Sequence, residues 1–192
     1  MPKIGAEPIR KAALVEATIL EIGQHGGLDV TVSQIARRAG MSSGLAHHYF
    51  GSKEDMFLAA MRHILAVYGA EVRGALIMAD TPQQRVQAIL RASFGATNFR
   101  SEVVSAWLNF WLMSKGNPGA RRLLTIYERR LQSNLTACLR PLLGDAAPRV
   151  AEATGAMIDG TYLRQALKLS PPDQKAAVAL IWTMIEAEIA RA

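Results

Sequence analysis

The sequence predicts an all-α protein: a three-helix helix-turn-helix head at the N-terminus, then a larger helical domain, with about nine helices in total. Three observations favour this fold. Half of the 192 residues are hydrophobic while only 6% are aromatic, a balance typical of packed helices rather than of a β-sandwich or barrel. Apolar residues recur at helical spacing. Capping side chains, prolines and glycines mark where successive helices begin and end.

The first three helices are each delimited by a local signal. The first ends at Gly26-Gly27, because glycine adopts the left-handed conformation that closes helices. The second begins at Thr31, which forms a capping box with the glutamine three residues later, and ends at Gly40. Ser42 caps a short third helix that runs to about Phe50.

The rest of the chain continues the same punctuation. Ser52, with Asp55 three residues later, opens a long fourth helix that runs to about Met78. Three later helices start with a capping side chain directly before a proline, at Thr81-Pro82, Asn117-Pro118 and Ser170-Pro171, and two more start near Glu102 and Pro148. Because the fourth helix must connect two functions, we predict a head at residues 1–51 and a second domain at residues 52–192.

The segment from Val32 to Phe50 fits a helix-turn-helix that reads DNA. Ala36 is the small residue that lets two helices cross, and Gly40, four residues later, tolerates the positive φ of the turn. The outward positions of the third helix are short or hydrogen-bonding and free of acids, namely Ser43, Gly44, His47 and His48. Such a face can approach the floor of the major groove without repelling phosphate.

An ordinary helical hairpin with solvated polar residues is the alternative interpretation of this segment. The net charge of +6 for the whole chain is a weak guide, so local clustering decides. No acid occurs between Val30 and Lys53, and basic residues flank the motif at Arg37-Arg38, at Lys53 and along an N-terminal arm formed by Lys3, Arg10 and Lys11. This pattern favours nucleic-acid binding.

Other classes of protein lack their usual signals. Cys138 is the only cysteine and the start of the chain has no apolar signal-peptide core, so we expect a cytoplasmic protein. The longest apolar run, residues 103–114, is too short to span a membrane. The four histidines form no metal-binding pair, and no phosphate-binding loop or catalytic constellation occurs. We therefore expect no enzyme activity, no metal and no cofactor.

The last two helices are suited to form a homodimer, because small residues on the first of them allow close approach of two backbones. Those small residues are Ala151, Ala153, Gly155, Ala156 and Gly160, and the last helix presents Val178, Ile181, Trp182, Ile185 and Ile189. Packing within one chain is the alternative. Both interpretations can hold, since an obligate dimer interface is a shared core.

Three aromatic residues fall on one face of the helix near Glu102, with Trp107, Phe110 and Trp111 at i, i+3 and i+4. Asp159 and Tyr162 lie one turn apart on a later helix. A quaternary ammonium cannot donate a hydrogen bond, so aromatic faces and a nearby carboxylate recognise it. Simple packing of the rings is the alternative, as is a pairing of Asp159 with an arginine such as Arg164 or Arg122.

Residues 31–58, TVSQIARRAGMSSGLAHHYFGSKEDMFL, resemble the signature of TetR-family repressors. Within that family the chain is similar to the choline-responsive repressors of the BetI type. The stretches that carry this similarity are MPKIGAEPIRKAALVEAT at the start, HYF after the turn, AWLNFW at residues 106–111 and IDGTYLR at residues 158–164.

The resemblance implies a ligand-responsive repressor that binds a palindromic operator in double-stranded DNA as a dimer and controls choline and glycine betaine metabolism in response to choline. The implied base-facing residues are Ser33, Ser43, Gly44 and His47, and the implied phosphate-facing residues are Thr31, Tyr49 and Lys53. Many family members have tyrosine where His47 stands, so the base preference there is open. The alternative is a TetR-family repressor that senses a different cationic or lipophilic molecule.

Overall fold

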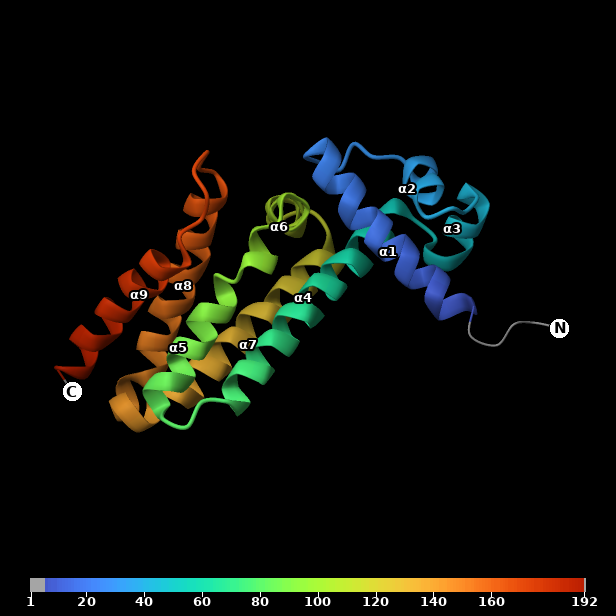
Figure 1. Cartoon of the computed structure of the whole chain (residues 1–192). Helices are drawn as coiled ribbons and strands as arrows, with labels where there is room; N and C mark the ends of the chain where they lie inside the picture. The colour runs from blue at the N-terminus through green and yellow to red at the C-terminus, as the bar shows by residue number, and fades with distance from the viewer. Residues whose placement is uncertain (1–5, 192) are drawn as a thin grey trace. The chain divides into compact units, whose positions relative to one another are not determined.

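The computed structural model describes residues 6–191, and the helix labels used below are those of Figure 1. Within those residues the chain forms nine α-helices, two short 3₁₀ helices and no strand, which confirms the predicted all-α fold. No helix in the same range is long and apolar enough to cross a membrane. Lys3, which the sequence assigns to the basic arm, lies outside the described residues.

The chain divides into two compact units. The first comprises residues up to Ala66 together with Arg100–Leu123. It contains α1 (Ala6–His25), α2 (Val32–Arg38), α3 (Ser43–Phe50), the first half of α4 (Lys53–Ile77), α6 (Ser101–Ser114) and the start of α7 (Pro118–Leu143). Helix α1 packs against both α2 and α6, and α2 packs against α3 (Figure 1).

Glycine permits the contact between α1 and α6. A Cβ on Gly23 would collide with the backbone and Cβ of Glu102, so any larger residue at position 23 would push these helices apart. The first compact unit therefore contains α6 together with α2 and α3, and it is larger than the head predicted at residues 1–51. The chain passes from one unit to the other within α4, again between Phe99 and Arg100, and a third time within α7.

The predicted helix starts in the head are confirmed by their capping bonds. Thr31 Oγ1 accepts a hydrogen bond from the Gln34 amide at 3.2 Å, and Gln34 Oε1 accepts one from the Thr31 amide at 2.7 Å. Ser42 Oγ accepts from the Leu45 amide at 3.3 Å. Gly40 has a φ of +68°, so the turn between α2 and α3 has the left-handed backbone that glycine tolerates best.

The second unit comprises Val67–Phe99 and Leu124–Ala192. It contains the second half of α4, α5 (Pro82–Ser93), the 3₁₀ helix η1 (Ala96–Phe99), most of α7, η2 (Gly144–Ala146), α8 (Ala147–Ala166) and α9 (Gln174–Ile189). Helix α9 packs against α8 and α5 (Figure 1). Its Ile181 and Ile185 are fully buried.

The predicted start of the last helix at Ser170-Pro171 is wrong by three residues. Helix α9 begins at Gln174, and Asp173 caps it by accepting a hydrogen bond from the Ala176 amide at 2.9 Å. Pro172 explains the difference, because a proline disfavours helical backbone in the residue that precedes it. Pro171 therefore cannot serve as the first residue of this helix.

Candidate functional site

The predicted reading surface is formed by side chains of α2 and α3. Ser33 and Gly44 are exposed and Ser43 is half-buried. The hydroxyls of Ser33 and Ser43 lie 3.0 Å apart and share a hydrogen bond, which links the two helices on the side the sequence assigns to DNA. Nothing lies within 4 Å of the position a Cβ would occupy on Gly44. Glycine is therefore not required there by the protein's own packing.

His47 is exposed on α3, and a hydrogen bond fixes its ring. Nδ1 lies 2.8 Å from the carbonyl oxygen of Gly51, and because a carbonyl only accepts, Nδ1 must carry the proton. In the neutral ring Nε2 is then an acceptor. An acceptor at this position matches the exocyclic amino groups of cytosine and adenine, which are the donors in the major groove, and contact of His47 with a base stays a prediction.

The predicted phosphate-facing residues have different surroundings. Thr31 is exposed and caps α2 as described above. Tyr49 is half-buried, and Lys11 Nζ lies 5.8 Å from its ring centroid. Lys53 Nζ donates a hydrogen bond to the Leu28 carbonyl at 2.9 Å, so its ammonium is held beside the segment that precedes α2.

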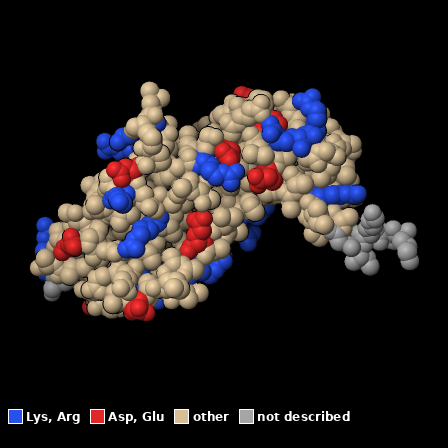
Figure 2. Space-filling view, viewed as in Figure 1, with Lys and Arg blue, Asp and Glu red and all other residues tan. Residues whose placement is uncertain are grey.

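The two adjacent arginines of α2 have different surroundings, although the sequence assigns both of them to the basic flank of the motif. Arg38 pairs with the buried carboxylate of Glu21 and also donates to Gln24, which fastens α2 to α1. The Arg37 side chain is exposed and has no hydrogen-bond or ion-pair partner among residues 6–191. Figure 2 shows Lys and Arg side chains over the part of the molecule formed by α1–α3. Arg37 is therefore an available cation that sequence reasoning did not separate from Arg38.

The predicted aromatic cluster of α6 forms. The ring centroid of Trp107 lies 5.8 Å from that of Phe110 and 5.6 Å from that of Trp111. Phe110 is fully buried, Trp107 is buried and Trp111 is half-buried. These three rings belong to the first unit, whereas Asp159 and Tyr162 belong to the second. The three rings of α6 therefore lie together in the first unit, and Asp159 and Tyr162 lie together in the second. A cage that contains all five side chains stays a prediction.

Asp159 has a tyrosine as its partner, which sequence reasoning missed. Tyr127 of α7 donates a hydrogen bond to Asp159 Oδ1 at 2.9 Å. The proposed alternative, an arginine paired with Asp159, is not found among residues 6–191. Burial raises the pKa of Asp159 to about 6 against the lowering effect of the Tyr127 hydrogen bond, and Glu128 raises it further. The carboxylate is thus held in a partly desolvated place.

Two more tyrosines surround this pair in the same unit. The Tyr68 ring centroid lies 6.2 Å from that of Tyr127, and its hydroxyl shares a hydrogen bond with Ser93 at 2.9 Å. Tyr162 donates to the Asn98 carbonyl at 2.7 Å, and its ring lies 4.9 Å from Phe99. Each hydroxyl is held by a protein group, so the rings are fixed in orientation. Three of the chain's four tyrosines lie here, a concentration that could have indicated the cluster.

The predicted dimer surface needs correction at Ala151 of α8 and at Ile181 and Ile185 of α9, because all three are fully buried within the chain. Val178, Trp182 and Ile189 are half-buried. The exposed positions of the same helix include one row with a spacing of four, three and four residues, at Ala176, Leu180, Thr183 and Ala187. On α8 the exposed small residues are Ala153, Ala156 and Gly160. Such alternating spacing is typical of helices that pair with other helices.

Comparison with known families matches both ends of the chain. Residues 14–60 match the model of bacterial regulatory proteins of the tetR family. Residues 82–190 match the model described as BetI-type transcriptional repressor, C-terminal. The two matches cover the helix-turn-helix and most of the second unit.

Curated relatives and solved structures agree with these matches. The HTH-type transcriptional regulator BetI of Brucella melitensis biotype 2 is 50% identical over 182 residues, which cover 94% of this chain and 92% of that protein. The regulator of the same name from Rhizobium meliloti is 48% identical over 190 residues, 98% of this chain and 94% of that one.

Among solved structures, a putative transcriptional regulator from Pseudomonas aeruginosa PAO1 superposes with a TM-score of 0.85 at 25% identity, covering 95% of this chain and 91% of that chain. A putative transcriptional regulator from Saccharomonospora viridis in complex with choline has a TM-score of 0.80 at 20% identity, covering 92% and 95%.

Proposed function

The chain belongs to the BetI-type branch of the TetR family of transcriptional regulators, and from this premise we propose that it is a dimeric, choline-responsive repressor of genes for choline and glycine betaine metabolism. The observation that carries the proposal is 50% identity to a BetI regulator across 94% of the chain. A repressor works where the chromosome is, so the proposal places the protein in the cytoplasm.

The proposed operator contact is made by α3 in the major groove. Ser33, Ser43, Gly44 and His47 face bases, while Thr31, Tyr49 and Lys53 face phosphates. To these we add Arg37, because its guanidinium is exposed and has no partner among residues 6–191. Arg38 is not included, since its pairing with Glu21 is part of the fold. Such phosphate contacts position the head and carry no sequence information.

The proposed dimer pairs the outward faces of α8 and α9 with the same faces of a second copy. Small side chains on α8, such as Ala156 and Gly160, allow close approach, and Leu180 of α9, which is 58% exposed, supplies apolar area. Two heads then reach half-sites about one helical turn, ~34 Å, apart. A palindromic operator follows from the two-fold symmetry of such a dimer.

The proposed effector site uses Asp159 as the countercharge for the quaternary ammonium of choline. Tyr162 and the newly assigned Tyr127 supply aromatic surface in the second unit, and Trp107, Phe110 and Trp111 are the contribution proposed for α6. Each cation–π contact is worth about 0.5–2 kcal/mol. Choline must favour a spacing of the two heads that no longer fits successive major grooves, and so weaken operator binding. Operator DNA must then weaken choline binding by the same factor.

A gel shift on a palindromic site with and without choline tests the repressor. We expect binding of a dimer without choline and loss of the complex when choline is added. If the operator complex forms but choline leaves it intact while another cation or lipophilic molecule dissolves it, the effector is different. If no specific complex forms, the proposal fails.

Calorimetry on single-ring variants tests the effector site. Trp107→Leu and Trp111→Leu should each weaken choline binding by roughly three- to thirtyfold. Trp182→Leu on α9 controls for the loss of an indole, with dimerisation measured for every variant, because Trp182 lies on the predicted dimer helix and donates its ring N–H to Glu186 at 2.7 Å. If both α6 variants fold, dimerise and bind choline as the wild type does, the α6 rings are packing and the site lies elsewhere.

A further inference from the structure

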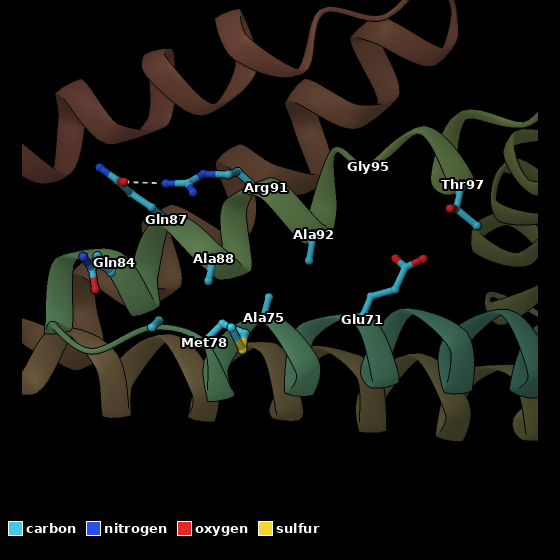
Figure 3. Close-up of a pocket in the computed structure, with 11 residues that line it drawn as sticks. Glu71, Ala75, Met78, Gln84, Gln87, Ala88, Arg91, Ala92, Gly95 and Thr97 are labelled. Atoms are coloured by element: carbon cyan, nitrogen blue, oxygen red, sulfur yellow. Dashed lines mark hydrogen bonds between the residues drawn. The ribbon is translucent and has the colours of Figure 1, made fainter.

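An open groove of about 730 Å³ lies between α4 and α5, and none of its lining residues belongs to the Asp159 site. Methyl groups form its two walls: Ala75 of α4 faces Ala88 and Ala92 of α5 (Figure 3). Because these side chains are so small, the helices leave space between them that no other residue fills. The groove therefore has an apolar middle section.

One end of the groove carries a carboxylate. Glu71 projects from α4 into the groove in the direction of Thr97 (Figure 3). Its side chain is half-buried, and among residues 6–191 it has no hydrogen-bond or ion-pair partner. A partly desolvated charge without a partner is unfavourable, and a bound cation would relieve that cost.

The remaining lining does not neutralise this charge. Arg91 is the one basic residue of the lining described here, and its guanidinium donates to Gln87 Oε1 at 2.6 Å. Both side chains point away from α4 (Figure 3). The opposite end of the groove is occupied by Met78, which is 83% exposed. A thioether on an unbranched side chain adapts readily to an apolar ligand.

We propose that this groove is a second ligand site, which binds a monovalent amphipathic cation with its ammonium head between Glu71 and Thr97 and its alkyl chain along Ala75, Ala88 and Met78. The volume is in the range of pockets that hold drug-sized ligands, about 300–1,000 Å³. Choline alone would fill little of it, so the site suits an ammonium with a chain of several carbons. This assignment goes beyond the choline response and does not depend on it.

The position of the groove gives it a route to regulation. Its first wall is the C-terminal half of α4, and the same unbroken helix begins at Lys53, beside the reading helices. A ligand that enters between α4 and α5 must therefore change the surroundings of the helix that leads into the head. A ligand whose affinity differs between the operator-bound and the free protein would couple the two sites, each influencing the other to an equal extent.

Calorimetry on the full-length protein with octyltrimethylammonium, in the presence of saturating choline, tests the site. We expect one binding event per chain that choline does not block, and no such event with octyl sulfate, which has the same chain and the opposite charge. Glu71→Gln should weaken binding roughly tenfold, as expected for loss of a charged contact. Asp80→Asn is the matched control, since Asp80 is an exposed acid just beyond α4.

A second variant tests the groove without changing charge. Ala75→Leu places a larger side chain between α4 and α5 and should abolish octyltrimethylammonium binding while leaving choline affinity as in the wild type. Equal binding of octyl sulfate, unchanged binding to Glu71→Gln, or competition by choline would each overturn the proposal. A wild type that binds octyltrimethylammonium but not choline would instead refute the choline response and support the groove.

Discussion

The predicted reading surface of the head and the second unit arrange their polar side chains in opposite ways. In the head, His47 bonds to a carbonyl four residues away and Ser33 to a hydroxyl ten residues away, and these groups are exposed. In the second unit, Tyr127 bonds to Asp159 across 32 residues and Tyr162 to Asn98 across 64, and both rings are buried. Substitutions on the predicted reading surface should therefore alter binding with little effect on stability, whereas those at the tyrosine cluster of the second unit should alter both.

The largest effect is expected at Ile181, which the sequence assigned to the dimer surface and which the structure places in the core. Ile181→Glu should destabilise the protein by more than about 4 kcal/mol, because it buries an unpaired charge. Leu180→Glu, one residue away and 58% exposed, should keep its helicity and melting behaviour but sediment as a monomer. Thermal denaturation and sedimentation velocity measure the two outcomes. A folded monomer from Ile181→Glu would reverse the assignment of the two faces of α9.

The next effect links stability and ligand binding at Asp159. Because burial raises its pKa from 3.8 to about 6, the folded protein holds this proton more tightly than the unfolded chain. The bound proton therefore stabilises the folded protein by up to ~3 kcal/mol below about pH 3.8, and this stabilisation is lost as the pH rises through about 6.

Asp159→Asn replaces the carboxyl group by a neutral amide, so stability no longer falls through ionisation at this position as the pH rises. The amide oxygen still accepts the Tyr127 hydrogen bond. We expect the variant to be more stable than the wild type at pH 7.5, equal to it near pH 3.5, and weaker in choline binding. Denaturant titrations at both pH values check this, with Glu128→Gln as a control that should change stability much less. A variant less stable at pH 7.5 would show that the carboxylate is compensated in the fold.

A smaller effect, confined to binding, is expected in the head. His47→Ala should weaken specific operator binding by about 1–3 kcal/mol and leave binding to random DNA unchanged. Arg37→Ala should weaken both and lower the salt slope by about one unit. Fluorescence anisotropy at several salt concentrations separates a base contact from a phosphate contact. Equal losses on both DNAs for His47→Ala would remove it from base reading.

The smallest effect on stability is expected at Gly44. An added methyl group meets nothing within 4 Å, and alanine is a better helix former, so Gly44→Ala should stabilise the head by about 0.5 kcal/mol. Operator affinity should nevertheless fall, since the methyl group occupies the surface assigned to DNA. Unchanged affinity in a gel shift would mean that position 44 does not approach the bases.

The head was predictable because its signals are local. The capping bonds of Thr31 and Ser42 and the positive φ of Gly40 depend on neighbours within a few residues, so residue type and spacing suffice to place the helices. The start of α9 was misplaced for a local reason as well: the effect of Pro172 on the residue before it outweighs the capping pattern at Ser170.

The site in the second unit was predictable only in part. The sequence by itself determined the all-α fold, the head, the aromatic face of α6 and the placing of Asp159 and Tyr162 on one helix, because each follows from the helical repeat. Only the tertiary structure decided that Tyr127 bonds Asp159, that Ile181 faces the core while Leu180 faces outward, and that Glu71 lines a groove with no hydrogen-bond or ion-pair partner within residues 6–191. Such contacts join residues far apart in the chain, and no local pattern encodes which helices pack together.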